Sequence, residues 1–279
     1  MNVAANARVS PLRASVCVDP GTTMFATALV VAALIMPTLG ALLIDERTIY
    51  DASVWDKPLK FELSLVIHLV TMGLVIGAIA PRLQSGWLVR TLALVTAFSA
   101  LGEVLYIVLQ AARGRASHFN FETPVEIAMY SVMGVGAVLL VVCAFALGLV
   151  VARSPRDGLG QGAKLGVVLG LTVGASLTLV IAGLMSSGVV DGPGHWIGGA
   201  RSDAQSLPLV GWSTTGGDLR VPHFFATHLM QVLPLLGLAA DKMAPGAAKI
   251  LVYVGTVVGF AIVAATFTQA LMGWPLLPL

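Results

Sequence analysis

The chain has 279 residues, of which 57% are hydrophobic and 11% are charged, and its mean hydropathy is +0.90. Soluble domains carry about 25% charged residues. The composition therefore excludes a soluble globular protein and predicts an all-α integral membrane protein whose main partner is the lipid bilayer. The net charge of +2 comes with no basic run suited to nucleic acid, so no nucleic-acid partner is expected.

Seven apolar runs follow a polar N-terminal tail over residues 1–22, and residues 23–279 are predicted to form a single transmembrane domain. The expected spans are about 24–44, 61–80, 89–111, 125–152, 165–186, 219–239 and 248–271. Each approaches or exceeds the ~20 residues that cross ~30 Å of hydrocarbon as a helix. The runs are continuous and do not alternate with a period of two, which favours helices over strands.

Seven spans place the two termini on opposite sides of the membrane. With the N-terminus inside, the inner segments hold nine Lys and Arg residues and the outer segments hold seven. The positive-inside rule then favours an inner N-terminus and an outer C-terminus. The outer segments include a long loop over 187–218, which we expect to form an ordered cap. In a bacterial inner membrane, this side would face the periplasm.

Local signals support several helix starts. Thr123 and Glu126 form a capping box with Pro124 at the first helical position, which predicts the start of span four. Asp56 and Asp218 are expected to cap spans two and six. Small residues at 166, 170 and 174 predict close packing of span five against a neighbouring helix.

All five histidines fall in the outer half of this topology: His68, His118, His195, His223 and His228. His68 and the acidic Glu103 lie roughly 12 Å, and His228 roughly 9 Å, from the outer ends of their spans. Their similar depth predicts one shared cavity.

Polar side chains recur at helical spacing and should face the bundle interior, because lipid cannot satisfy them. We expect His228 and Gln231 to point into the bundle and His223 to lie nearer the rim. Candidate catalytic residues are Glu103, Asp218, Arg220 and His223. Further polar site residues are Ser64, Tyr106, Gln110, His118, His195, Arg201, Asp203 and Gln231.

Two cofactors are compatible with these residues. His68, Glu103 and His228 could bind a divalent metal, Zn or Fe, which needs three or four N or O ligands. His68 and His228 could instead be the axial ligands of haem b. His223 and His228 are five residues apart, about 140° around a helix, so they are not expected to bind one ion together. The alternative is that these histidines are hydrogen-bonded packing residues.

The chain resembles in part the alkaline ceramidases, a family of seven-span zinc hydrolases. The resemblance consists of Ser64 and His68 four residues apart on span two, an acid on span three and a later histidine pair. In this chain the later histidines are spaced by five, they lie on span six, and the acid is Glu103. The resemblance implies a zinc-dependent membrane hydrolase as one alternative.

The leading expectation is an outward-facing His/Glu site in a haem- or metal-dependent oxidoreductase that acts on a lipid-soluble or membrane-proximal substrate. The remaining alternative is a non-catalytic transporter, sensor or accessory subunit whose polar core is a proton or ion site.

Overall fold

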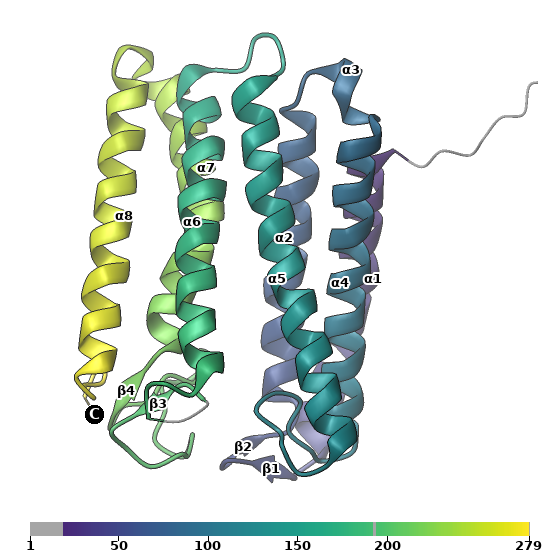
Figure 1. Ribbon diagram of the computed structural model, residues 1–279, viewed down its shortest axis with the longest axis vertical. Helices are drawn as coiled ribbons and strands as arrows, with labels where there is room; N and C mark the ends of the chain where they lie inside the picture. The colour runs from purple at the N-terminus through teal and green to yellow at the C-terminus, as the bar shows by residue number, and fades with distance from the viewer. Residues whose placement is uncertain (1–18, 192–193, 279) are drawn as a thin grey trace, which may run out of the picture.

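The computed structural model describes residues 19–191 and 194–278, so most of the predicted polar tail lies outside the described residues. Long helices run side by side along the molecule (Figure 1). In chain order the helices are α1 (Pro20–Ile44), α2 (Asp56–Gly77), α3 (Pro81–Gln84), α4 (Trp87–Ala112), α5 (Pro124–Arg153), α6 (Gln161–Ser187), α7 (Arg220–Met243), the 3₁₀ turn η1 (Pro245–Ala247) and α8 (Ala248–Leu271).

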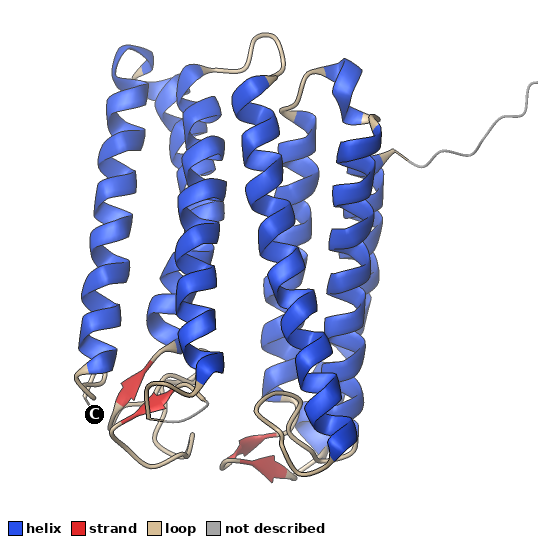
Figure 2. Ribbon diagram, viewed as in Figure 1, coloured by secondary structure: helices blue, strands red, loops and turns tan. Residues whose placement is uncertain are grey.

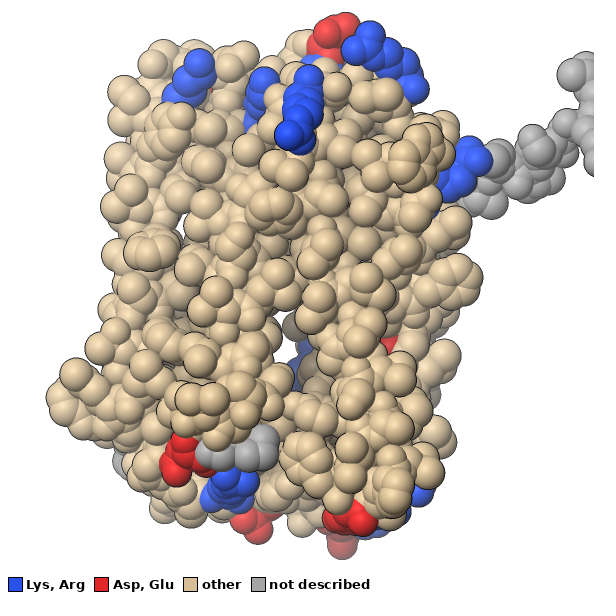
Figure 3. Space-filling view, in the orientation of Figure 1, with Lys and Arg blue, Asp and Glu red and all other residues tan. Residues whose placement is uncertain are grey.

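Seven of these helices are long and apolar enough to cross a membrane. Figure 3 shows charged side chains gathered at the two ends of the visible face, with an almost uncharged band between them. Both observations indicate an integral membrane protein and confirm the predicted all-α bundle of seven apolar helices. The short helices α3 and η1 were not predicted.

The two ends of the bundle differ. One end carries the connections 45–55, 113–123 and 188–219, and we call it the loop-rich end; the other is the short-loop end. Both two-stranded sheets lie at the loop-rich end (Figure 2). They pair β1 (Thr48–Ile49) with β2 (Ala52–Ser53), and β3 (Trp196–Ile197) with β4 (Gly217–Asp218). Sequence patterns did not predict them, because two-residue strands have no readable alternation.

The main apolar core fills the half nearer the short-loop end. It combines the first turns of α1, the second half of α2 and the facing parts of α4, α5 and α6. Met24, Leu69, Met72, Leu147 and Leu171 are fully buried there. Most buried acids lie in the other half, so the polar residues are concentrated near the loop-rich end.

α6 and α7 pack with their backbones close together, as the small-residue spacing predicted. A Cβ added at Gly174 would lie 3.1 Å from the Ala226 carbonyl oxygen, and one added at Gly170 would lie 2.8 Å from the Leu229 carbonyl oxygen. Asp241 of α7 also accepts hydrogen bonds from the amides of Gly162 (2.8 Å) and Ala163 (2.7 Å) at the start of α6. These contacts hold the two helices in register.

Helix boundaries differ from the predicted ones where capping decides them. α1 begins at Pro20 because the Asp19 carboxylate accepts the Thr22 amide at 3.1 Å. The capping box is confirmed: Thr123 accepts the Glu126 amide at 3.3 Å and donates to its carboxylate at 3.0 Å. The predicted cap at Asp56 is wrong, because Asp56 is the first helical residue of α2 and Trp55 precedes it without a side-chain cap.

Candidate functional site

Glu103 is a carboxyl group within the bundle that lacks a direct partner. It lies on α4, nine residues before the end of the helix at Ala112, and only 3% of it is exposed. Neither of its carboxylate oxygens has a hydrogen-bond partner among the described residues. On α5, Gly136 leaves room for it, because a Cβ there would lie 2.8 Å from Glu103 Oε1. A buried polar group of this kind requires a partner from outside the chain or a polar solvent molecule.

His118 is the titratable side chain nearest to Glu103. Its Nε2 lies 3.9 Å from Glu103 Oε2, too far for a hydrogen bond, and its Nδ1 lies 3.1 Å from the Ser117 hydroxyl. The ring centroids of Phe61 and Tyr130 lie 5.7 Å and 6.1 Å away. Burial lowers the pKa of His118 well below its usual range, and the charge of Lys57 lowers it further. The imidazole is therefore neutral near pH 7.

Two lysines lie in the first turns of α2, and one of them, Lys57, completes the surroundings of Glu103. Lys57 and Lys60 form no ion pair or hydrogen bond with any residue that the structure describes, although Lys57 interacts electrostatically with Glu103. The Lys57 ammonium lies 5.8 Å from the centre of the Phe61 ring. We call Lys57, Phe61, Glu103, Gly136 and His118 the Lys57–Glu103 site. The polar side chains of this site, Lys57, Glu103 and His118, make no hydrogen bonds with one another.

Sequence reasoning found Glu103 and His118 but left Lys57 out of the site. Lys57 and Phe61 precede Ser64 and His68 at helical spacing, on one face of α2. The helical spacing of these four residues is the signal in the sequence that could have identified Lys57 and Phe61. Ser64 itself is exposed.

The loop between α6 and α7 is tied down by Arg220. The Arg220 guanidinium lies 2.8 Å from an Asp203 oxygen and 2.7 Å from an Asp218 oxygen. Asp218 is 2% exposed and also accepts the Ser213 amide at 2.9 Å. Burial would raise the pKa of Asp218, but the charge and hydrogen bonds of Arg220 outweigh it and hold that pKa below its usual range. Asp218 and Arg220, predicted as catalytic, have their polar atoms committed to this anchor.

His195 and Trp196 extend the anchored loop across the end of the bundle. Their rings lie 3.6 Å apart, and Tyr50 meets Trp196 edge-on at 5.3 Å. The Asp203 amide donates to the Tyr50 carbonyl at 2.8 Å, which joins this loop to the 45–55 connection. Burial, and then the charge of Arg220, lower the pKa of His195 to about 3. The loop is thus joined to the 45–55 connection at the loop-rich end.

The two histidines of α7 have the opposite orientations to those predicted. His223 has a buried Nδ1 without a partner in the described residues, and Met230, seven residues further on the same face, is 1% exposed. His228 shares its face with Phe224, Val232 and Leu235, which are 37%, 54% and 63% exposed. Its Nδ1 lies 2.9 Å from the Phe224 carbonyl oxygen. His223 therefore points to the bundle interior and His228 toward its periphery.

The predicted metal ligands are not brought together. Within residues 19–191 and 194–278, no three His, Cys, Asp or Glu side chains are grouped closely enough to hold a metal ion. His68 lies near the middle of α2 with its Nε2 buried and unpartnered, Glu103 faces His118, and His228 lies on the peripheral face of α7. His68, Glu103 and His228 therefore do not form a three-ligand metal site.

Four other predicted site residues, Tyr106, Gln110, Arg201 and Gln231, are not part of the Lys57–Glu103 site. Tyr106 is buried in an apolar cluster with Ile107 and Met133. Gln110 is fully buried and bridges Arg113 and the Ala116 carbonyl, at 2.8 Å and 3.3 Å. Arg201 is exposed and donates to the Asp191 carbonyl at 2.8 Å, whereas Gln231 is partly buried on α7.

Three polar contacts of acidic side chains were not predicted from the sequence. Glu62 is fully buried and accepts a hydrogen bond from Thr38 of α1 at 2.7 Å. Arg115 lies 2.8 Å from Glu126 and also pairs with Glu122. These contacts join α1 to α2, and the 113–123 connection to the start of α5.

The surface has an opening between α5 and α6. These helices lie close together near the short-loop end and separate toward the loop-rich end (Figure 1). Figure 3 shows a hole in the same region, with a basic side chain visible behind it. The basic residues that α2 and α7 carry in this half are Lys57, Lys60 and Arg220. The polar half of the bundle is therefore reachable from the side.

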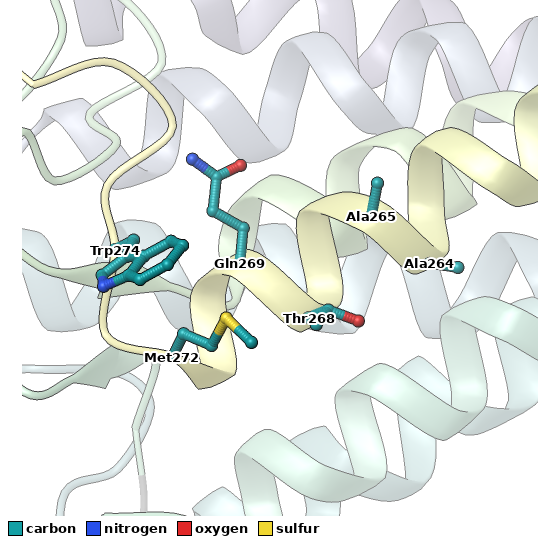
Figure 4. A pocket seen from close by; sticks show the side chains of 6 residues that line it. All are labelled: Ala264, Ala265, Thr268, Gln269, Met272 and Trp274. Atoms are coloured by element: carbon teal, nitrogen blue, oxygen red, sulfur yellow. The ribbon is translucent and has the colours of Figure 1, made fainter.

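A separate shallow groove runs along the end of α8 and has no titratable side chain in its lining (Figure 4). Its walls are formed by Ala264, Ala265, Thr268, Gln269, Met272 and Trp274. Without an acid, a base or a nucleophile, this groove is not a candidate site for chemistry.

Comparison of the chain with protein-family models, with curated proteins and with solved structures gave no match.

Proposed function

We propose that this protein is a membrane-bound oxidoreductase that takes a lipid-soluble molecule from the bilayer and holds its polar end at the Lys57–Glu103 site. The observation that carries the proposal is the buried, unpartnered carboxyl group of Glu103, next to a neutral His118 and a Lys57 without an ion pair.

The chemistry of these groups supports the proposal. A carboxyl group and a neutral imidazole exchange protons readily, which oxidation of hydroxyl groups and reduction of carbonyl groups both require. The two electrons of such a reaction would pass to or from a one-electron carrier, the chemistry that haem b would supply. The opening between α5 and α6 faces the apolar band of the surface (Figure 3), so a lipid-soluble substrate would reach the site from the bilayer. We further propose that the loop-rich end faces the periplasm of a bacterial cell.

Mass spectrometry of organic extracts from the purified protein tests this function. Wild type should co-purify with a lipid-soluble molecule in near-stoichiometric amount, and Glu103→Gln should lose it. Glu46→Gln is the matched control, because Glu46 is exposed and makes no contact that the structure records. Equal occupancy in all three proteins, or none in wild type, would refute the proposal.

A second proposal concerns the cofactor. His68 has a buried Nε2 without a partner, and one histidine is sufficient to hold haem b, whereas a zinc or iron site needs three ligands. Haem b at His68 would supply one-electron chemistry. Wild type should then show a Soret band that His68→Ala loses and His228→Ala retains. A wild-type protein without a Soret band after haem supplementation would exclude this cofactor.

A non-catalytic transporter or sensor would use the same ligand site without chemical change of the ligand. Turnover of the co-purified molecule by the reconstituted protein would distinguish the two classes.

A further inference from the structure

The charged groups around the Lys57–Glu103 site nearly cancel. The charges of Glu103 and Asp203 attract Lys57, those of Asp56, Asp203 and Asp218 attract Lys60, and Arg220 repels both lysines. The cations are thus matched by at least as many acids. A ligand with a full charge of either sign would meet a group that carries the same charge when ionised, Glu103 for an anion and Lys57 for a cation. The site therefore favours a neutral polar group.

The unused hydrogen-bonding groups define that polar group further. Lys57 offers only donors, whereas a carboxylate at Glu103 offers only acceptors, and the neutral His118 ring can do either. The 3.9 Å between His118 Nε2 and Glu103 Oε2 is too long for a direct bond. A ligand that both accepts and donates hydrogen bonds within a small area would satisfy all three.

The walls of the site are aromatic. The ring centroids of Phe61 and His118 are 5.7 Å apart, and those of His118 and Tyr130 are 6.1 Å apart. These rings pack against one another in tilted and edge-on pairs, so a ligand beside them would meet aromatic faces and edges, which favour a flat ring. A flexible acyl chain would not use this geometry.

A neutral flat ring, with oxygens that accept as a carbonyl and donate as a hydroxyl, and with an apolar tail that partitions into lipid, describes a quinone and its quinol. We infer that the lipid-soluble ligand of the Lys57–Glu103 site is a quinone or quinol. Its ring oxygens are placed between Lys57 and Glu103, and its tail extends toward the opening between α5 and α6. This inference rests on the proposed function and names its substrate class.

The site offers a matched pair of variants on one helix. A Cβ at Gly136 would lie 2.8 Å from Glu103 Oε1, so Gly136→Ala would displace the carboxyl group while keeping every polar side chain. A Cβ at Gly134 has nothing within 4 Å, so Gly134→Ala is its control. Lys57→Gln has a control in Lys249→Gln, at the exposed start of α8.

The test is a titration of the detergent-solubilised full chain with a short-chain ubiquinone analogue. The midpoint of thermal unfolding is measured at each ligand concentration. Wild type, Gly134→Ala and Lys249→Gln should show the same saturable rise. Glu103→Gln, Lys57→Gln and Gly136→Ala should need at least about tenfold more ligand to reach half of that rise. The first two variants each remove a charged hydrogen-bonding partner of the ligand, and the third displaces one. If Glu103→Gln does not fold, Gly136→Ala and Lys57→Gln carry the comparison.

No saturable rise in wild type, or equal affinity in all variants, would overturn the inference. A parallel titration with palmitate separates the ligand classes: a rise with the same sensitivity to the variants would show that the site takes a fatty acid, which overturns the quinone assignment. In that case the proposed function survives. If no lipid-soluble molecule binds in this titration or co-purifies, both fail.

Discussion

At the scale of single residues, Glu103 and His223 are polar groups buried inside an apolar bundle, and the rotation of their helices decides what they face. Glu103 was identifiable because an acid within a membrane span needs a special environment. Lys57 was overlooked because it lies at the edge of a span, where a lysine is ordinary. On α7, spacing gave the angle between His223 and His228, but the absolute rotation of the helix depends on its packing against α6. For this reason the sequence predicted His228, and not His223, to be the histidine that points into the bundle.

The buried histidines predict a loss of stability in acid. The pKa of His195 falls to about 3 and that of His118 lies well below its usual range, whereas the unfolded chain has a histidine pKa of about 6.5. The unfolded chain therefore binds more protons below pH 6.5. The stability that the neutral rings contribute is complete above about pH 6.5 and is lost as the pH falls toward the folded pKa.

The thermal unfolding midpoint between pH 7.5 and pH 4.5 measures this effect. Each ring can contribute a slope of up to about 1.4 kcal/mol per pH unit. His195→Gln, compared with wild type over the same range, should depend less steeply on pH. An unchanged slope in His195→Gln would show that His195 is not a neutral ring in the folded protein.

At the scale of helices, prediction succeeded where one strong signal was enough. A continuous apolar run of this length has few alternatives to a membrane helix, so all seven were identified. Their ends were less accurate, because ends depend on individual caps such as Asp19. The pairing of β3 with β4 joins residues about twenty apart in the cap loop. It depends on the anchored loop around Arg220, which no local pattern encodes.

Two glycines of α6 give a prediction about helix packing. A Cβ at Gly166 would collide with the Leu233 backbone and lie 3.1 Å from Pro234 Cα, whereas a Cβ at Gly183 has nothing within 4 Å. Gly166→Ala should therefore destabilise the protein by about 1–3 kcal/mol through overpacking. Gly183→Ala should be neutral or stabilising by up to about 1 kcal/mol, because alanine favours helix. Thermal unfolding of both variants checks this, and equal midpoints would argue against close α6–α7 packing.

At the scale of the whole molecule, apolar packing and polar chemistry occupy different halves. The main core near the short-loop end holds α1, α2, α4, α5 and α6 together. Toward the loop-rich end α5 and α6 separate, and the anchored loop lies beyond the ends of α6 and α7 (Figure 1). Buried polar groups cost stability unless they are paired. The extensive core in the other half offsets that cost and leaves the polar half available for a ligand.

The charge distribution predicts how this asymmetric molecule is oriented in the membrane. With the N-terminus inside, the Lys and Arg excess lies on the cytoplasmic side, and the loop-rich end faces outward. Leu209 of the cap loop is 92% exposed, and Asp157 is exposed at the short-loop end. In a chain with Cys17→Ser and Cys143→Ala, Leu209→Cys should react with a membrane-impermeant maleimide in intact cells. Asp157→Cys should react only after the membrane is permeabilised. The reverse pattern would place the Lys57–Glu103 site on the cytoplasmic side, and the proposed substrate would then exchange protons with the cytoplasm.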